Sequence, residues 1–574
     1  MNALHPIRSL SALAAATVIL AGLPSEGRTA SAVQQADSGT RLPMQNGTAR
    51  QRGSGAGSFM DLQPAPYKAR KSPHVLHRRG LAVVADFANT RLEDWQGDGF
   101  NNTEEIASQL RQMSDHWAWL SRGKESFHWD IIRVTLPDPA GPTTYSSWWD
   151  YRNAVAAQIR RQVDVSRYDG NKDGIIDSAW IISSNVGMAY DYLIGGMSQH
   201  MGVNMFVDAQ DSGSVIAGAT GNYNHEVGHT LGLPDLYGPY QSLHYLTLMS
   251  DSWELPPADF TAYERSMLGW LVPDVLKRGS QNVRLSSRPD RMDALRINTS
   301  RPSEYFLIEY RRRPDSGYGS VAPPYNGLAI YHVLEGSSQQ IDPPLVKLEA
   351  ADGYIEPDGF PQLNDFLSPA NPDMRMPLIV RSYFDGQEVF RIDNLYMSGQ
   401  NAIGFHIQTA ETPSPINNLL LNPSFETAQA GDPQAWAREA WQPTSDLAWD
   451  ATVSRTGQSS ASITSTSPND SRWLQTVTNL IPGQAYQFCG WVRGENISTG
   501  ADAPVGANLS LMGQDGRSED LTGTFDWKQL CVTFRAQQSS ATLACRMGFY
   551  GSTVTGKMWC DDMTVERLRS AFTQ

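Results

Sequence analysis

The segment NHEVGHTLGLPDLYG, residues 224–238, places two histidines four positions apart, and this spacing constrains the fold more than any other feature of the chain. Residues four apart lie on one face of an α-helix, so in a helix His225 and His229 can present two imidazoles to the same metal ion. Together with Glu226 they form the pattern H-E-x-x-H, which is typical of zinc sites. A catalytic zinc ion needs a third protein ligand and keeps its fourth position open.

Asp235 is the predicted third ligand. Gly232 lies three residues after His229, where a glycine can adopt a positive φ, end the helix and turn the chain back. Pro234 then restricts the approach to Asp235, whose carboxylate oxygen is a suitable zinc ligand. The competing assignment is His244, which would need a longer loop to return to the ion. The spacing favours Asp235.

Two further residues complete the predicted site. Glu226 follows the first ligand on the helix and faces the open side of the ion, where it can hold a water molecule and act as general base. Met249, in the segment LTLMSDSW, follows at a distance suited to a tight turn beneath a zinc site, although an isolated methionine is more often a core residue. This combination predicts hydrolysis of peptide bonds by a zinc-activated water.

The chain begins with the features of a secretory signal. Arg8 precedes an apolar run, and residues 30–32 read ASA, so we expect removal of residues 1–32 on export. Leu23 stands where a lipid-anchored signal would need a cysteine, and no later segment is apolar enough to span a membrane. These features predict a secreted protein. Its formal net charge of -14 argues against a nucleic-acid partner.

Composition divides the rest of the chain into five parts. Residues 33–80 have little apolar periodicity and end in basic sites, as in a propeptide or a plain disordered leader. Helical spacing alternates with buried strand-like runs over residues 81–275, which predicts an α/β zinc peptidase domain. Short alternating runs predict a β-rich extension of that domain over residues 276–410. A linker with prolines, residues 411–418, leads to a predicted all-β sandwich over residues 419–574.

All the cysteines lie in this last part: Cys489, Cys531, Cys545 and Cys560. In an oxidising compartment an even number of clustered cysteines predicts two disulfides, for which three pairings exist. We favour Cys489 with Cys531 and Cys545 with Cys560, because each pair lies on strand-like segments that can be neighbours. The alternative is that they are free thiols that act as small core residues.

Several segments together resemble the immune inhibitor A family of secreted, metzincin-like metallopeptidases. They occur in order between about residues 81 and 409 and read HEVGHTLGLPDLYG, LMSDSW, AYERSMLGW, YFLIEYRRR, GLAIYHV and LEAADG. The resemblance implies a metzincin-like fold, zinc ligands at His225, His229 and Asp235, the catalytic base at Glu226 and the turn methionine at Met249. It also implies a latent precursor and endopeptidase activity on proteins or peptides.

Two features depart from the family. The segment AYERSMLGW carries Tyr263 and Arg265 where the family commonly has a tryptophan and a lysine, a change that bears on the edge of the predicted cleft. No cysteine precedes Cys489, so latency cannot depend on a propeptide cysteine, as it does in some metzincins. Asp61, in the segment SFMDLQP, is the candidate zinc-binding group of the leader.

The segment YDGNKDGIID resembles a calcium-binding loop. It offers oxygen ligands at Asp169, Asn171, Asp173 and Asp177, and Gly174 permits a sharp turn. Trp180 stands where an EF-hand has its closing glutamate, so the loop is not a full EF-hand. The segment is either a stabilising calcium site or a solvated acidic turn.

The predicted C-terminal sandwich resembles carbohydrate-binding modules of the galactose-binding-like type. The matching segments are NPSFE, GQSSASITS, IPGQAYQFCGWVRG and DDMTVE. Trp441, Trp449, Trp473 and Trp491 are candidates for stacking on sugar rings, although some of them are expected in the core. Glu426 and Asp561 are candidate ligands of a structural calcium ion, as in similar modules.

These observations predict a secreted zinc endopeptidase with zinc, and in one reading also calcium, as cofactors. Its fold class is an α/β zinc domain with a β-rich extension, followed by an all-β sandwich that binds a polysaccharide or a cell-envelope glycan. The alternative is a non-catalytic surface or glycan-binding protein that retains a peptidase scaffold. Glu226 favours the enzyme, because a scaffold without turnover has no chemical need for this carboxylate.

Overall fold

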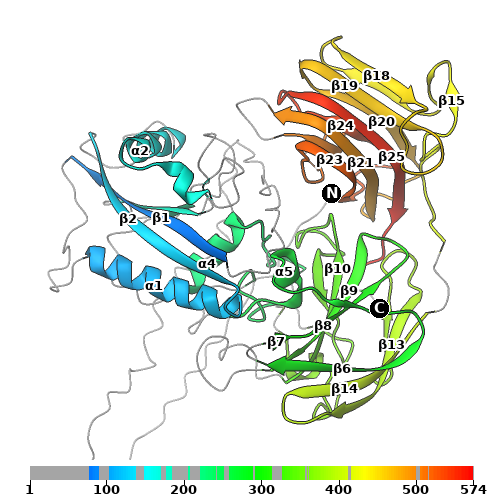
Figure 1. Cartoon of the computed structure of the whole chain (residues 1–574). Coiled ribbons are helices and arrows are strands. Elements are labelled where there is room, and N and C mark those ends of the chain that lie inside the picture. The colour runs from blue at the N-terminus through cyan, green and yellow to red at the C-terminus, as the bar shows by residue number, and fades with distance from the viewer. Residues whose placement is uncertain are drawn as a thin grey trace, which may run out of the picture. The chain divides into compact units, whose positions relative to one another are not determined.

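The structure is a computed structural model of the whole chain (Figure 1). It describes residues 76–88, 102–137, 148–169, 176, 178–183, 204–206, 220–240, 242–250, 258–288, 291–312, 326–355, 359, 361–410, 415–499, 505–514 and 516–572. All of them belong to one compact unit, Ser58–Gln574. The predicted signal peptide, most of the predicted leader and Asp61 lie outside the described residues. Within the described part, no helix combines the length and apolar character needed to cross a membrane.

Four parallel strands form the N-terminal sheet, in the order β2-β1-β3-β4. Their bounds are β1 (Leu76–Phe87), β2 (Glu125–Leu136), β3 (Ala179–Ser183) and β4 (Asn204–Phe206). The run LAVVA in β1 is buried on both faces, as expected of a central strand in a parallel sheet. Leu81, Val83 and Ala85 belong to one core cluster, whereas Ala82 and Val84 belong to another. The sheet therefore needs cover on each side.

Helices supply this cover. They are α1 (Asn102–Leu120), α2 (Trp148–Gln162) and α4 (Thr220–Thr230). Met113 and Trp117 of α1 lie in the core cluster of Val84, whereas Val155 and Ile159 of α2 lie in the other cluster. The two helices thus pack on opposite faces of the sheet, as the predicted alternation of helices and strands requires. The assignment of this part to the metzincin fold stays a prediction.

A short helix, α5 (Ala262–Met267), precedes two further sheets. Their strand orders are β11-β10-β9-β8-β5 and β12-β13-β14-β6-β7. Their bounds are β5 (Asp274–Val275), β6 (Ser280–Arg288), β7 (Arg291–Met292), β8 (Ala294–Asn298), β9 (Glu304–Arg311), β10 (Gly327–Leu334), β11 (Val346–Leu348), β12 (Leu378–Arg381), β13 (Glu388–Met397) and β14 (Ala402–Thr409). Short 3-10 helices occur at Val165–Tyr168 and Leu363–Asp365. The strand-like runs predicted after residue 275 are thus confirmed as strands.

β9 is buried on both faces and joins two cores. Phe306 contacts Phe390 of β13 edge to face, with ring centroids 5.1 Å apart, in the core between the two sheets. Leu307, which points the other way, lies in the core cluster that also contains Met113 of α1. The first of these sheets therefore packs on the helical part.

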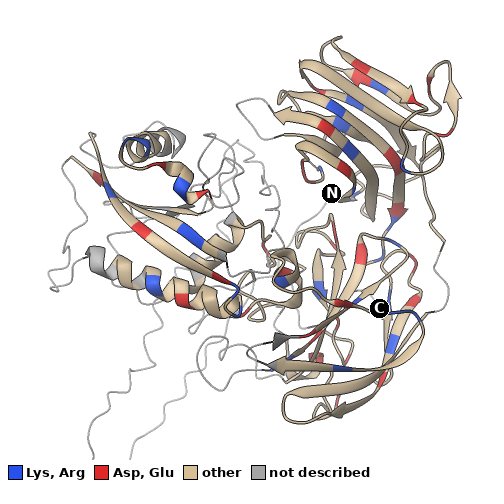
Figure 2. Cartoon of the chain, in the orientation of Figure 1, with Lys and Arg blue, Asp and Glu red and all other residues tan. Residues whose placement is uncertain are grey.

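The C-terminal part is a sandwich of two antiparallel sheets, in the orders β17-β20-β24-β22 and β18-β19-β25-β21-β23, with a small β15-β16 pair. Their bounds are β15 (Ala428–Gln429), β16 (Asp432–Pro433), β17 (Ala437–Ala440), β18 (Ser445–Asp450), β19 (Ser460–Asn469), β20 (Ser471–Thr478), β21 (Ala485–Thr499), β22 (Ala507–Leu511), β23 (Gly523–Arg535), β24 (Ser540–Met547) and β25 (Val554–Arg567). Figure 2 shows basic and acidic residues interspersed over both β-rich parts.

The disulfides pair as favoured from the sequence. Cys489 of β21 lies opposite Cys531 of β23 and is bonded to it. Cys545 of β24 is bonded to Cys560 of β25, so this bond joins the two sheets of the sandwich. Both are compatible with folding in an oxidising compartment.

Two segments differ from the simple boundaries expected from composition. β1 begins at Leu76, so the last residues of the predicted leader form part of the sheet. Arg78, one of the basic residues considered as processing sites, is buried and forms an ion pair with Glu125 at 2.9 Å. In the predicted linker, the carbonyl of Pro415 accepts a hydrogen bond from Arg301, and the backbone N–H of Asn417 donates one to Glu566. The described end of the linker is therefore hydrogen-bonded both to the β-rich part that precedes it and to the C-terminal sandwich.

Candidate metal centre

α4 presents both histidines to one side because its other side is apolar. Val227 and Leu231 are buried in the core shared with α1. Asn224 fixes the contact between the two helices, since its side-chain Nδ2 donates to the carbonyl of Met113 at 3.0 Å. His225 is buried, with its ring centroid 4.7 Å from that of His229.

The helix ends as the glycine predicts. Gly232 has a φ of +88°, a left-handed conformation that costs a glycine little. Its N–H donates to the carbonyl of His229, and the N–H of Leu233 donates to the carbonyl of Gly228, each at 3.0 Å. This pair of bonds is the Schellman motif, which reverses the chain direction at a helix C-terminus. The reversal brings Asp235 back to the histidines.

Three side-chain atoms converge at this point. Nε2 of His225 lies 3.1 Å from Nε2 of His229, and Oδ1 of Asp235 lies 3.2 Å and 3.0 Å from the two nitrogens. In a tetrahedral zinc site with bonds of about 2.0–2.2 Å, neighbouring ligand atoms are about 3.3–3.6 Å apart. The three atoms therefore approximate one face of such a tetrahedron. Among the described residues they form the group of three or more histidine, cysteine or carboxylate side chains that is close enough to hold a metal ion.

The second ring nitrogens orient the imidazoles. Nδ1 of His225 lies 2.8 Å from the carbonyl oxygen of Leu248, and Nδ1 of His229 lies 2.8 Å from that of Leu233. A carbonyl only accepts, so each Nδ1 carries the proton, and Nε2 of the neutral ring presents a lone pair to the centre. Hydrogen bonds of this kind accompany most histidine ligands of metals.

The charge distribution fits a cation. Oδ1 of Asp235 is buried and has no hydrogen-bond donor, so three electron-rich atoms face one another at about 3 Å. In the protonated form of the histidines, burial still opposes ionisation of Asp235, but the hydrogen bonds and charge of His225 and His229 hold the pKa of its carboxyl below the usual range. The Asp235 side chain as a whole is 41% exposed, so the centre is open to solvent on this side. These residues therefore suit zinc with one position left for another ligand.

Met249 lies beneath the helix, as predicted. It is fully buried in a turn, and a Cβ added to Gly228 would lie only 2.8 Å from its sulfur. The carbonyl of Met249 accepts a hydrogen bond from the N–H of Leu236 at 2.8 Å. The same turn thus supports α4 and the loop that carries Asp235.

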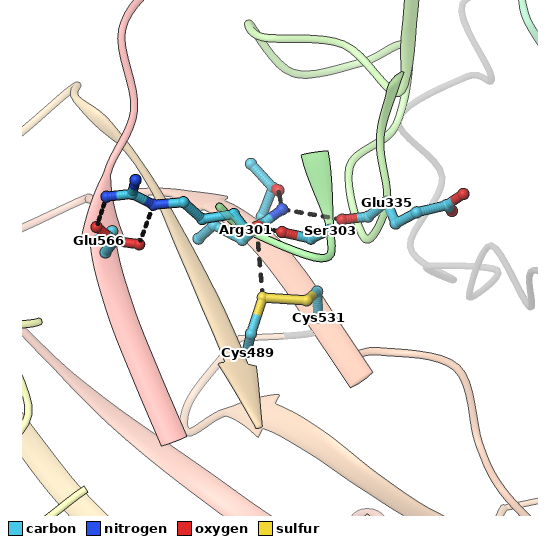
Figure 3. The surroundings of a disulfide bond; sticks show 8 residues. Arg301, Ser303, Glu335, Cys489, Cys531 and Glu566 are labelled. Atoms are coloured by element: carbon cyan, nitrogen blue, oxygen red, sulfur yellow. Dashed lines mark hydrogen bonds and ion pairs between the residues drawn. A yellow bond between two sulfur atoms is a disulfide. The ribbon is translucent and has the colours of Figure 1, made fainter. Parts of the chain in front are cut away.

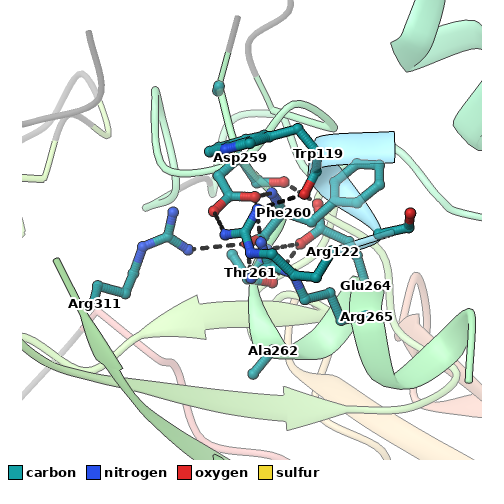
Figure 4. Close-up of polar contacts among 12 residues, drawn as sticks. Trp119, Arg122, Asp259, Phe260, Thr261, Ala262, Glu264, Arg265 and Arg311 are labelled. Atoms are coloured by element: carbon teal, nitrogen blue, oxygen red, sulfur yellow. Dashed lines mark hydrogen bonds and ion pairs between the residues drawn. The ribbon is translucent and has the colours of Figure 1, made fainter. Parts of the chain in front are cut away.

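A buried polar cluster lies next to the turn that contains Met249 (Figure 4). Nothing in the sequence indicated this cluster. The Asp259 carboxylate forms ion pairs with Arg122, two residues after the end of α1, and with Arg265 of α5. The Asp259 carbonyl accepts from the N–H of Leu248, whose own carbonyl holds Nδ1 of His225. The cluster therefore helps to orient the His225 imidazole, with Leu248 as the residue between them. A buried carboxylate between two arginines has no recognisable signature in one sequence.

The segment AYERSMLGW belongs to this interior and not to the edge of a cleft. Tyr263 and Arg265 are 1% and 2% exposed. Arg265 donates to the carbonyl of Phe260 at 2.6 Å, in addition to its ion pair with Asp259. Both residues are therefore part of the core.

Other candidate residues lie elsewhere. His244 is not part of the group around Asp235; its ring contacts Tyr245, with centroids 4.7 Å apart. The backbone of Glu226 lies within α4, but its side chain lies outside the described part of the structure. In the predicted calcium loop, Asp169 ends a 3-10 helix. The other predicted ligands lie outside the described residues, namely Asn171, Asp173 and Asp177.

The second calcium candidate consists of carboxylates that bind backbone N–H groups. Glu426 accepts from Gln458 and Ser459, at 3.0 and 3.1 Å. Asp561 is buried and accepts from the backbone of Arg455 at 2.7 Å and from that of Thr456 at 3.2 Å. The two carboxylates therefore hold one turn in place, and a calcium ion there stays a prediction.

No family model matches the sequence, and no curated protein matches it. Among solved structures, TmCBM61 in complex with β-1,4-galactotriose is 19% identical and matches 26% of this chain and 99% of its own, with a TM-score of 0.18. The CBM22-1 xylan-binding domain of Paenibacillus barcinonensis Xyn10C is 15% identical over 28% of this chain and 99% of its own, with a TM-score of 0.19. The enzymatically active domain of bacteriophage CBA120 tailspike protein 4 is 12% identical over 26% of this chain and 21% of its own, with a TM-score of 0.21. Scores at this level transfer neither a ligand nor an activity to this chain.

Proposed function

We propose that this chain is a secreted, metzincin-like zinc endopeptidase that hydrolyses peptide bonds in extracellular proteins. The observation that carries the proposal is the convergence of His225, His229 and Asp235 with their lone pairs directed at one point. Secretion is supported by two disulfides in the C-terminal sandwich. The order of sequence motifs, which resembles the immune inhibitor A family, agrees with this function.

Each residue has a distinct task in this proposal. His225, His229 and Asp235 would hold zinc, which when bound supplies a Lewis acid that polarises the scissile carbonyl and lowers the pKa of water to about 7. Asp235 lowers the net positive charge of the site. Glu226 takes the proton from the attacking water and returns it to the leaving amine. The buried Leu248 and Leu233 carbonyls keep both imidazoles in the tautomer that binds metal.

Metal removal tests this function directly. We expect the purified secreted protein to contain about one zinc per chain and to hydrolyse casein. Incubation with a zinc chelator should abolish hydrolysis, and stoichiometric zinc should restore it, because the three protein ligands stay in place. Chelator-resistant hydrolysis would contradict a zinc mechanism, whereas a chain that binds zinc and hydrolyses no protein would favour the non-catalytic scaffold.

A second candidate function, glycan binding by the sandwich, is favoured by one exposed tryptophan. Trp473 is fully buried, the indole N–H of Trp449 donates to a backbone carbonyl, and the Trp491 ring is covered by the Arg455 guanidinium at 3.7 Å. Trp441 is different, because it is 58% exposed. A Cβ added to Gly551 would lie 3.8 Å from its ring, and the neighbouring Tyr550 is 47% exposed. An exposed aromatic ring such as that of Trp441 is suited to stacking on a sugar.

We therefore expect Trp441→Ala to weaken binding to polysaccharide by about fivefold, since one ring–sugar contact contributes on the order of 1 kcal/mol. Affinity electrophoresis in gels that contain soluble polysaccharides would measure the change. The matched control is Leu421→Ala, which changes another exposed apolar residue of the same sandwich, at 68%. If both variants migrate as the wild type does in every polysaccharide, the Trp441 platform is not a glycan site.

A further inference from the structure

The loop between β10 and β11, residues 335–345, contacts three parts of the molecule that are far apart in the sequence. We call it the bridging loop. It follows the last residue of β10, Leu334, and leads directly into β11 at Val346. One face of it meets the loop that carries Asp235, another meets the C-terminal sandwich, and a third meets the end of the chain. Each contact is made by specific hydrogen bonds or by close backbone approach.

Towards the metal centre, the contact is made by Gln339. This side chain is 2% exposed, and its Nε2 donates to the carbonyl of Leu236, the residue after Asp235, at 3.2 Å. The same amide exchanges two bonds with the backbone of Val346, at 2.9 and 3.2 Å, which fix its orientation. The backbone approach is equally close, because a Cβ on Gly238 would lie 2.5 Å from the Gln339 carbonyl oxygen.

Towards the sandwich, the bridging loop meets the edge that contains the Cys489–Cys531 disulfide (Figure 3). The carbonyl of Glu335 accepts from the side chain of Gln487 at 2.9 Å, and that of Gly336 accepts from the N–H of Thr533 at 2.7 Å. Gly336 has a φ of +79°, and a Cβ there would lie 2.5 Å from the backbone oxygen of Cys531. No other residue fits this position without displacing the sandwich.

A buried ion pair secures the same interface beside the loop. Arg301 of the extension is 5% exposed and binds both oxygens of Glu566 of β25, at 3.1 and 2.8 Å. Ser303 donates to Gln487, the residue that also binds the bridging loop, at 2.7 Å. Both charged groups are buried in the docked state, so the pair links the extension to the sandwich through bonds that exist only when the two are in contact.

The end of the chain completes the arrangement. The backbone N–H of Ala571 donates to the carboxylate of Asp342 in the bridging loop at 2.6 Å. The ring of Phe572 lies 6.0 Å from that of Tyr240, which belongs to the segment that follows Asp235. Sandwich, bridging loop and metal-binding loop are therefore packed together in one continuous set of contacts.

We propose that the docked sandwich, through the bridging loop, positions the third metal ligand, and that Gln339 is the positioning residue. This inference rests on the proposed zinc function and deepens it. A tethered glycan-binding module would need no such contacts. Because residues that orient metal ligands commonly change metal affinity by 10- to 100-fold, zinc retention should depend on residues of the bridging loop that never touch the ion.

The first test compares Gln339→Met with Gln475→Met. Methionine keeps the length of glutamine and makes no amide hydrogen bonds. Gln475 is also buried and also binds a backbone N–H and carbonyl, both of Leu421, but it lies within the sandwich. The two variants should therefore lose similar folding stability, which urea unfolding would check. Zinc release to a chromogenic chelator, measured while both proteins are folded, is the decisive readout.

We expect Gln339→Met to release zinc about 10- to 100-fold faster than the wild type, and Gln475→Met to release it at the wild-type rate. A zinc-loaded wild type with the same release rate as Gln339→Met overturns this inference alone and leaves the peptidase proposal standing. A wild-type chain without zinc overturns both.

The second test addresses the sandwich itself. Gly336→Ala should displace it from the bridging loop, so that limited proteolysis near the linker releases it and zinc release accelerates. Gly483→Ala is the matched control, since Gly483 has a φ of +81° but nothing within 4 Å of its added Cβ. Equal zinc release and equal protease resistance in the two alanine variants would show that the docked sandwich has no role in the metal site.

Discussion

The Asp235→Ala protein is expected to bind zinc much more weakly than the wild-type chain and to lose peptidase activity together with the metal. Changing a residue that only orients a metal ligand lowers metal affinity by about 10- to 100-fold. Removing a ligand itself should lower it further. The reason is the ligand count. Two imidazoles remain, at 3.1 Å from each other, and the only charged member of the triad is gone. Metal analysis after dialysis against a weak chelator would give well below one zinc per chain.

The turn that positions Asp235 should survive the substitution, so the loss can be assigned to the carboxylate. The Schellman bonds at Gly232 and Leu233 involve backbone atoms alone. Wild-type helix content in the variant would confirm that α4 is intact. Zinc should also raise the unfolding temperature of the wild type and leave that of Asp235→Ala nearly unchanged, because a ligand stabilises only the state that binds it.

His244→Ala is the control for the competing ligand. His244 lies outside the group formed by the two histidines and Asp235, so this variant should keep its zinc and its activity. The reverse pattern, with zinc retained by Asp235→Ala and lost from His244→Ala, would show that the spacing argument selected the wrong residue.

The geometry of the centre could be predicted because it is local. Two histidines four residues apart, a glycine three residues later and an aspartate three residues after that specify a helix, a left-handed turn and a return. Each step involves backbone contacts within about ten residues. The disulfide pairing could be favoured for a similar reason, since alternating strand-like segments around the cysteines suggested which of them are neighbours.

The support of the centre could not be predicted, because it depends on contacts over long sequence separations. Gln339 binds Leu236 across 103 positions, and Arg122 pairs with Asp259 across 137. An isolated glutamine in a polar loop looks like any solvated residue until the tertiary fold buries it. The tryptophans of the sandwich show the same limit, since their sequence contexts do not distinguish the exposed Trp441 from the buried Trp473.

The C-terminal sandwich is held against the rest of the chain by buried contacts and not by the linker alone. Composition alone suggested a module joined by a proline-containing linker. The buried Arg301–Glu566 pair and the bridging loop instead connect the module to the part that contains the candidate metal centre. Removal of residues beyond the linker would therefore expose Arg301 without its partner and uncover the bridging loop. Loss of zinc after such a truncation is consistent with a positioning role for the sandwich and does not argue against the zinc site.

The Glu226→Gln protein should behave differently from Asp235→Ala, and this difference separates catalysis from metal binding. Glutamine has the size of glutamate but cannot accept a proton at neutral pH, so turnover should fall by about 10² to 10⁴, the range typical of lost general acid–base catalysis. The zinc ligands and the carbonyls of Leu248 and Leu233 that orient them do not include residue 226, so zinc should stay near one per chain.

Initial rates of peptide hydrolysis, combined with metal analysis of the same samples, test this expectation for Glu226. A variant with full zinc and full activity would show that another group accepts the proton. A variant that loses zinc together with activity would mean that Glu226 supports the metal itself. If Glu226 is the general base, the variant should keep its zinc and lose most of its turnover. A non-catalytic scaffold could not give this result, because its wild-type chain would have no turnover to lose.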